Sequence, residues 1–146
     1  GGGENLPYLK QMAADLRLTG QVEFTGRVSD EVVCETLSTA DLCVAPDPIN
    51  PLNDKSTMNK ILEYMAMSKP IVSYRLKESA YSAGPAAIFA KVNNEEDFAR
   101  RILELLEDPQ RREEMGRLGY QRLRNELSWE HSTVHLLDAY RYLRAI

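Results

Sequence analysis

Short apolar runs alternate with amphipathic segments over the first ninety residues of the chain. Each run is rich in β-branched or small apolar residues, and most are closed by glycine, proline or a charged residue, which is typical of buried strands. Because their apolar residues are continuous rather than alternating with polar ones, we expect both faces of the sheet to be covered. The strands expected are Gln21–Gly26, Asp41–Pro46, Pro70–Arg75 and Ala86–Lys91.

The segments between the strands carry apolar residues at the spacing of helices. Ser29 is interpreted as an N-cap, with Val32, Val33 and Leu37 turned inward. The segment Leu76–Gly84 is interpreted as a loop or half-turn. The helices expected are Tyr8–Leu18, Ser29–Ala40, Thr57–Met67, Glu95–Asp108, Pro109–Glu126 and Ser128–Ile146.

This order of elements predicts an α/β fold, a Rossmann-like parallel sheet flanked by crossover helices. Right-handed crossovers place the strand-to-helix loops at one end of such a sheet, where ligands bind outside the carboxyl ends of the strands. Residues 1–146 are expected to form a single domain, with 128–146 as its terminal helix.

Composition narrows the class of protein. The chain is 43% hydrophobic with a net charge of −4, which suits a soluble domain and argues against a nucleic-acid partner. No apolar run approaches the length of a membrane span, and no signal peptide is recognised. Cys34 and Cys43 lack metal-type spacing and are expected to be buried, reduced thiols, which favours a cytoplasmic location.

The stretch Asp54–Val72 has the features of an anion site. Its expected helix begins with backbone N–H groups that have no intrahelical partner and with a partial positive charge, an arrangement that phosphate often occupies. Ser56 and Thr57 offer hydroxyls there, and Lys55 and Lys60 offer positive charge.

Glu63 lies too deep in the expected helix to cap it, on the same face as Asn59. A carboxylate in that position is able to accept two hydrogen bonds from the vicinal hydroxyls of a ribose. The alternative is an ordinary surface glutamate paired with Lys60, beside an ordinary helix start.

Several quoted segments, taken in order, resemble the C-terminal nucleotide-binding domain of glycosyltransferase family 4, one half of the GT-B architecture. They are "VEFTGRVSD", "ADLCVAPD", "ILEYMAMSKPIV", "NNEEDFARRILELLEDPQRREEMG" and "LSWEHS". The stretches "PDPINPLNDKSTMNKILEYMAMSKPIV" and "LKESAYSAGPAA" are similar to a bacterial subgroup that makes surface polysaccharides.

The resemblance implies a role for each matching residue. Glu63 matches the second glutamate of the family's Glu-x7-Glu motif, which holds the donor ribose. Ser56, Thr57 and Met58 match the segment whose backbone amides meet the diphosphate. The matches beside the donor base and in the preceding Gly-x-Gly turn are Val28 with Asp30, and Gly2 with Gly3.

The chain departs from the family pattern in two respects. Lys55 stands where the first glutamate of the motif contacts the donor sugar, so Asn59 and Lys60 are candidates to replace part of that contact. The family domain normally begins about fifty residues earlier, with an Arg and a Lys that bind the diphosphate, and it follows an acceptor-binding domain. The sequence is therefore interpreted as a piece of a two-domain enzyme, with little or no activity expected of it alone.

The resemblance implies a retaining transfer of a sugar from a nucleotide diphosphate sugar to an acceptor held by the other domain. The acceptor expected is a glycan, a lipid-linked sugar or another hydroxyl compound. The location expected is cytoplasmic, which includes the inner face of the plasma membrane if the intact enzyme associates with it peripherally. The competing hypotheses are a non-catalytic nucleotide-binding or assembly module and a GT-B sugar-nucleotide epimerase.

Neither a cofactor nor a metal is expected. Asp41, Asp47 and Asp54 are interpreted as loop or capping acids rather than metal ligands, and His131 and His135 lack a third ligand. Lys77 and Glu78 follow an expected strand and are predicted to face the same crevice, either in contact with the donor sugar or as a surface ion pair.

Overall fold

The computed structural model describes residues 2–144, and the chain divides into two compact units between Thr36 and Leu37. The first unit contains helix α1 (Leu6–Asp15), with Pro7 in its first turn, and the beginning of α2 (Asp30–Thr39). Between them the backbone turns through Arg17 and Gly20, both with positive φ. The second unit contains the sheet and the remaining helices.

The strand expected over residues 21–26 is wrong. Only an isolated bridge joins Thr19 to Val22, and residues 23–26 have no regular structure. A strand needs a neighbour to accept its backbone hydrogen bonds, and no other segment described in the first unit runs beside this one as a strand. The inward orientation expected for Val32 and Val33 is also wrong, because both are exposed.

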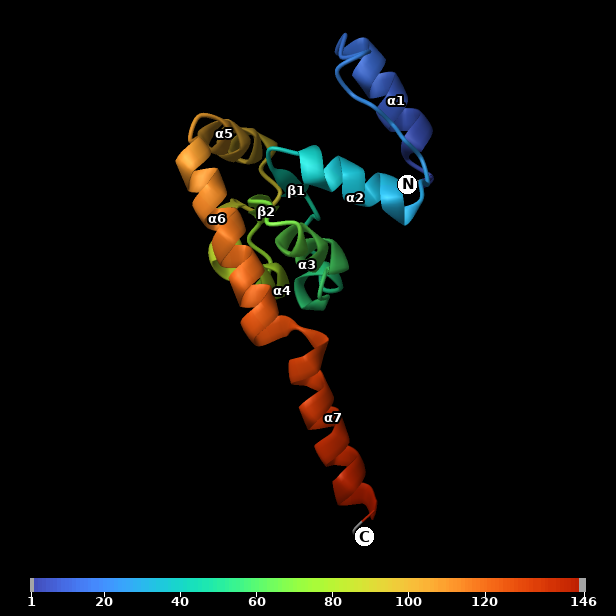
Figure 1. Cartoon of the computed structure of the whole chain (residues 1–146). Coiled ribbons are helices and arrows are strands. Elements are labelled where there is room, and N and C mark those ends of the chain that lie inside the picture. Colours follow the sequence, from blue (N-terminus) through green and yellow to red (C-terminus); the bar gives the residue numbers. More distant parts are fainter. Residues whose placement is uncertain (1, 145–146) are drawn as a thin grey trace. The chain divides into compact units, whose positions relative to one another are not determined.

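Three parallel strands form the centre of the second unit: β1 (Cys43–Ala45), β2 (Ile71–Tyr74) and β3 (Ala87–Ala90). The sheet order is β1-β2-β3, with Cys43 beside Ile71 and Ile71 beside Ala87. β1 and β2 lie among helices α3 to α6 (Figure 1). These strands confirm the predictions for the three later apolar runs.

Among the described residues, the second unit holds five α-helices besides the end of α2. They are α3 (Asn59–Ala66), α4 (Lys77–Ala83), α5 (Glu95–Leu106), α6 (Pro109–Arg122) and α7 (Trp129–Arg144). Shorter turns are the 3-10 helices η1 (Asn53–Lys55) and η2 (Gly84–Ala86) and the π-helix η3 (Leu123–Leu127). The prediction of a loop over 76–84 is wrong, because α4 occupies most of that segment. None of the helices described has the length and apolarity that a membrane crossing requires.

Hydrophobic cores cover both faces of the sheet. On one face Ile71 packs with Ile61 and Met65 of α3, and on the other Val72 packs with Phe98 and Leu105 of α5. Neighbouring residues of β2 point to opposite faces, so both cores are built from one continuous apolar strand, as expected for a parallel sheet covered on both sides. The helical spacing of Met58, Ile61, Leu62 and Met65 predicts that these residues face the sheet. Ile61 and Met65 lie in the first core and Met58 and Leu62 pack against it, which confirms this inner face of α3.

Helix α6 comes unusually close to its neighbours at two glycines. A Cβ at Gly116 would lie 2.0 Å from the carbonyl oxygen of Ser68, and one at Gly119 would lie 2.7 Å from the Cβ of Ala86. Since Ser68 lies two residues after the end of α3, Gly116 fixes the C-terminal end of α3 against α6.

Candidate functional site

The loops that follow β1 and β2 meet at the carboxyl edge of the sheet. The Asp54 carboxylate accepts a hydrogen bond from the Lys77 amide at 3.0 Å, and its second oxygen lies 3.5 Å from the Lys77 ammonium. The Thr57 hydroxyl donates to Glu78 at 3.4 Å. The structure thus places Lys77 and Glu78 beside the segment that leads into α3, as expected for residues at one edge of a parallel sheet.

Asparagine side chains shape the loop between β1 and α3. Asn50 Oδ1 accepts the amides of Leu52 and Asn53, which forms a local turn. Asn53 in turn donates from its side-chain amide to the carbonyl of Pro48. Asn93, in the loop after β3, accepts the amide of Ile49 at 3.0 Å and so ties a third strand end to the same edge.

Helix α3 begins without a side-chain cap. Its N-cap residue is Met58, whose backbone is extended and whose side chain accepts no hydrogen bond. Among the described residues, no hydrogen bond has the amide of Thr57, Met58, Asn59 or Lys60 as its donor. The structure therefore leaves a group of free donors at the helix start, where the helix dipole favours an anion.

The two hydroxyls expected to assist an anion are already engaged. Ser56 Oγ donates to the carbonyl of Leu52 at 2.7 Å, and Thr57 Oγ1 donates to Glu78. In this geometry the hydroxyls hold the loop and α4 in place, and the unpaired donors of the segment are its backbone amides.

Lys60 is held by Asp47 rather than by Glu63. Its ammonium donates to both carboxylate oxygens of Asp47, at 2.8 and 3.0 Å. Asp47 follows β1, so this ion pair ties the strand end to the first turn of α3. The alternative in which Glu63 is a surface partner of Lys60 is therefore wrong.

The Glu63 side chain is exposed, and no group among the described residues donates to it or forms an ion pair with it. Four residues along a helix cover about 6 Å, which is the axial distance from Asn59 to Glu63. Asn59 is also exposed and lies on the same side of the helix. One edge of α3 thus presents free amides, then an amide side chain, then a free carboxylate.

The charges around this edge almost balance. Lys55, Lys60 and Lys77 face four carboxylates, those of Asp47, Asp54, Glu63 and Glu78. The hydrogen bond from the Lys77 amide lowers the pKa of Asp54, so this carboxyl stays ionised at neutral pH. A dianion at this edge would need further positive charge or the replacement of one of these ion pairs.

The remaining predicted residues lie in the first unit. Gly2 and Gly3 precede α1, and a Cβ at either position would have no atom within 4 Å. Val28 is half-buried, and Asp30 is the exposed first residue of α2. The roles that the resemblance implies for these residues stay predictions.

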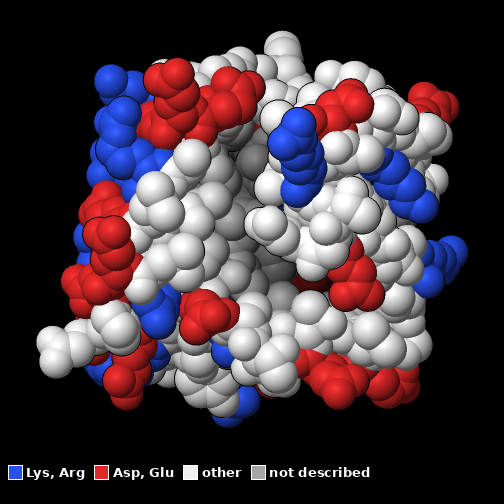
Figure 2. Space-filling model, turned by 90° about the horizontal axis from the view of Figure 1, so that it is seen from above, with Lys and Arg blue, Asp and Glu red and all other residues white. Residues whose placement is uncertain are grey.

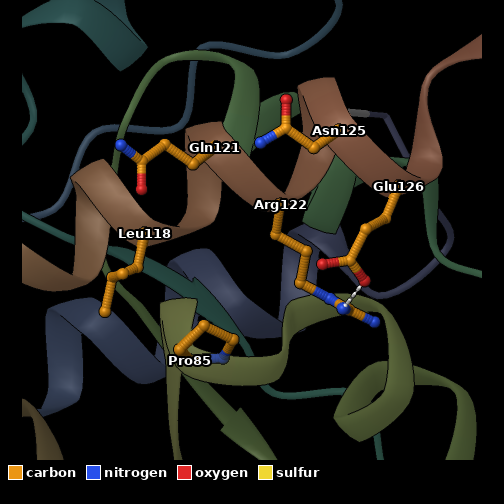
Figure 3. Close-up of a pocket in the computed structure, with 6 residues that line it drawn as sticks. All are labelled: Pro85, Leu118, Gln121, Arg122, Asn125 and Glu126. Carbon is orange, nitrogen blue, oxygen red and sulfur yellow. Dashed lines mark hydrogen bonds and ion pairs between the residues drawn. The ribbon is translucent and has the colours of Figure 1, made fainter.

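A separate shallow cavity of about 240 Å³ lies beside η2 and the end of α6 (Figure 3). It is lined by residues of η2 and of α6 and η3, namely Pro85, Leu118, Gln121, Arg122, Asn125 and Glu126. The guanidinium of Arg122 is already used, since it donates to the carbonyls of Tyr81 and Ser82 and to Glu126. None of the residues that line this cavity belongs to the predicted site.

Neither the distribution of charged side chains nor the metal-ligating residues indicate a further site among the described residues. Basic and acidic side chains are interspersed on the face shown in Figure 2. Within residues 2–144 no three His, Cys, Asp or Glu side chains come together as a metal site would require. His131 contacts the carbonyl of Arg124 at 3.3 Å, so its neighbour is a backbone oxygen.

Comparison with known proteins identifies the family. The family model for glycosyl transferases group 1 matches residues 1–108, and the chain therefore belongs to this family. The lipopolysaccharide core biosynthesis glycosyltransferase LpsE of Rhizobium meliloti (strain 1021) is 30% identical over 147 residues. That match covers 99% of this chain and 40% of LpsE, so the chain spans well under half the length of this relative.

A solved structure shows the same fold. Sucrose-phosphate synthase from Thermosynechococcus elongatus matches with a TM-score of 0.85 and 21% identity, over 98% of this chain and 35% of that protein. The chain thus has the Rossmann-like α/β fold of one half of a GT-B glycosyltransferase, which confirms the resemblance seen in the sequence.

Sequence reasoning missed the structural roles of four side chains at this edge. Asp47 and Asp54 were interpreted as loop or capping acids, but their partners Lys60 and Lys77 were not foreseen. The roles of Asn50 and Asn93 in shaping the loops were missed altogether. The three prolines between residues 46 and 51 do indicate a loop there. No local pattern indicates that Asp54 reaches a helix that begins 23 residues later.

Proposed function

We propose that this chain is the donor-binding part of a retaining glycosyltransferase that moves a sugar from a nucleotide diphosphate sugar to an acceptor during synthesis of a cell-surface polysaccharide. Membership of the glycosyl transferases group 1 family supports the transferase activity, and the similarity to LpsE supports the polysaccharide context. The transfer takes place on the cytoplasmic side of the membrane in this proposal.

One observation carries the donor-binding role. The free amides of residues 57–60 and the unpaired Glu63 carboxylate lie along the same edge of α3. The amides suit a diphosphate, and the carboxylate suits the two hydroxyls of a ribose, so a single nucleotide has a partner for each of its polar parts. Capping of the helix by its own side chains would have removed this possibility.

The helix start also suits the chemistry of the reaction. As the bond to the donor sugar breaks, negative charge grows on the departing diphosphate, and fixed amides at a helix start stabilise that charge without reorganisation. The acceptor hydroxyl is assisted by an oxygen of the donor phosphate, so the side chains of this edge bind and orient the donor.

The other predicted residues complete the donor site in this proposal. Asn59 and Lys60 take over part of the sugar contact from the glutamate that Lys55 replaces, and Lys77 and Glu78 approach the sugar from α4. The resemblance to glycosyltransferase family 4 implies a role toward the base for the backbone of Val28 and for Asp30, and a role in the Gly-x-Gly turn for Gly2 and Gly3, and these roles stay predictions.

The near balance of charge at the edge implies that other groups contribute to donor affinity. The resemblance to glycosyltransferase family 4 implies an Arg and a Lys in a strand and helix that precede Gly1 in the intact enzyme, and an acceptor-binding domain before them. Positioning of two substrates supplies a large share of a transfer barrier. We therefore expect weak nucleotide binding and little or no transfer by these 146 residues alone.

Isothermal titration calorimetry with uridine and guanosine diphosphates tests the proposal. Loss of two charge-assisted hydrogen bonds in Glu63→Ala should weaken binding by at least about tenfold. Glu113→Ala is the matched control, because Glu113 is an exposed glutamate in the first half of α6. We expect the control to bind as the unchanged chain does.

Three results would contradict the proposal. Equal affinity of Glu63→Ala and the unchanged chain would remove the ribose role. Absence of binding to either nucleotide would favour an assembly module. Conversion of a nucleotide sugar to its epimer without an acceptor would identify the epimerase alternative.

A further inference from the structure

Helix α4 is capped by a residue from a distant part of the chain. Its N-cap residue is Leu76, which has no side-chain acceptor and is almost fully buried. The first-turn amides of a helix need acceptors from outside the helix. Asp54 provides one, because its Oδ1 accepts the Lys77 amide at 3.0 Å.

Asp54 occupies a central place at the edge of the sheet. It belongs to η1, directly before Lys55, Ser56 and Thr57, and its side chain is only 18% exposed. The Thr57–Glu78 hydrogen bond joins the same two segments as the Asp54–Lys77 contacts do. The loop before α3 and the first turn of α4 are thus joined at two places. The two loop residues are three positions apart, and their partners on α4 are neighbours in the sequence.

We propose that Asp54 is a positioning residue of the donor site, which sets the distance between the diphosphate-binding loop before α3 and the sugar-facing first turn of α4. This inference rests on the proposed function. Asp54 itself contacts no part of the donor in this arrangement. It acts through the Lys77 amide, by keeping the free amides of the loop and the Lys77 and Glu78 side chains in one fixed geometry.

The hydrogen bond rather than the charge carries this role. The Lys77 side chain is 80% exposed and its ammonium lies 3.5 Å from Asp54, and such surface ion pairs contribute little. An asparagine at position 54 keeps an oxygen that accepts the Lys77 amide, whereas an alanine leaves the amide without its partner. The variants Asp54→Asn and Asp54→Ala therefore separate the two contributions.

Asp108 provides a matched control at the other end of the unit. Its carboxylate accepts the Arg111 amide at 2.9 Å as the N-cap of α6, so the chemistry is the same. Arg112 in that first turn lies 3.7 Å from Asp41, which precedes β1, so this cap belongs to the amino edge of the sheet. Asp108→Ala removes a comparable cap away from the donor site.

The experiment measures amide hydrogen exchange by nuclear magnetic resonance and nucleotide affinity by calorimetry on the same variants of the full chain. We expect Asp54→Ala to speed exchange at Lys77 and to weaken uridine or guanosine diphosphate binding by about fivefold to tenfold. Asp54→Asn should leave the exchange rate at Lys77 and the nucleotide affinity within about twofold of their values in the unchanged chain. Asp108→Ala should speed exchange at Arg111 and leave affinity unchanged.

Specific outcomes would overturn the inference. Unchanged affinity in Asp54→Ala, with binding by the unchanged chain still dependent on Glu63, would remove the positioning role alone. Equal losses of affinity in Asp54→Ala and Asp108→Ala would show a general effect of stability. Absence of nucleotide binding by the unchanged chain would overturn the proposed function, and this inference with it. If Asp54→Ala does not fold, Asp54→Ser is used instead. The serine side chain is shorter than that of aspartate and does not reach the Lys77 amide.

Discussion

The two ends of helix α3 differ in how completely their polar groups are satisfied. At the C-terminal end the Lys69 amide bonds to the carbonyl of Tyr64 at 2.9 Å, Ser68 takes a left-handed backbone, and Gly116 of α6 closes over it. At the N-terminal end, the amides of residues 57–60 and the Glu63 carboxylate have no partner among the described residues.

The two ends of this eight-residue helix therefore have different tasks. The closed end contributes to stability, and the open end binds the donor in the proposed function. The inner face, with Ile61 and Met65 fully buried, and the closed C-terminal end hold α3 to the sheet and to α6. Because those contacts fix the helix, its other end keeps unpaired donors in place without help from a cap. Substitutions at the two ends should therefore affect different properties.

The largest effect is expected at the closed end, for Gly116→Ala. The added methyl group would lie 2.0 Å from the Ser68 carbonyl oxygen, so the backbone of one helix must move. Overpacking of this kind costs about 3 kcal/mol, well above the roughly 1 kcal/mol that alanine gains over glycine in a helix. Urea unfolding measures the change in the free energy of unfolding.

Gly3→Ala is the control for this substitution, because a Cβ there meets no atom within 4 Å. The control should change the free energy of unfolding by less than about 0.5 kcal/mol. A small effect of Gly116→Ala would mean that α6 does not close the end of α3 as described.

An intermediate effect is expected in alkali at Tyr64, in the middle of α3. Its hydroxyl donates to the Val44 carbonyl at 3.3 Å, and burial raises its pKa to about 12. The unfolded chain ionises at a pKa of about 10, so stability is fully present below pH 10 and declines as pH rises toward 12.

Tyr64→Phe tests this pH dependence. Because the side chain is partly exposed, solvent reduces the effect, and we expect the unchanged chain to lose about 1 kcal/mol more stability between pH 9 and 11 than the variant loses. The comparison uses urea midpoints at each pH. Parallel decline of both proteins would show that Tyr64 does not contribute.

The smallest effect on stability is expected at the open end, for Asn59→Ala. Asn59 is exposed and caps nothing, and alanine favours helix, so the free energy of unfolding should stay within about 0.5 kcal/mol. Nucleotide affinity should fall all the same if the open end binds the donor. A loss of stability here as large as that at Gly116 would remove the distinction between the two ends.

The sequence predicted those features that depend on local periodicity. The inner face of α3 and the three strands β1, β2 and β3 follow from apolar spacing alone. Helix α4 was missed because it is short and its cap, Asp54, comes from another segment. The strand expected at 21–26 failed because a strand also depends on a neighbour that its own residues do not specify.

The same division applies to the candidate site: features within one helix were predictable, and contacts between distant segments were not. The free helix start and the position of Glu63 follow from spacing along one helix. The partner of Lys60 did not, because the choice between Glu63, three residues away, and Asp47, thirteen residues away, depends on where β1 ends in space. Contacts between loops of different strands require the folded sheet.

The two cysteines differ in their access to reagents. Cys34 is exposed, contrary to the burial expected for it, while Cys43 is buried in β1 and burial raises its pKa to about 11. Thiol reagents attack the thiolate, so at neutral pH a maleimide dye should label the folded chain at Cys34 alone. The native sequence thus offers a single attachment point on α2 for a fluorophore or spin label, with no residue replaced.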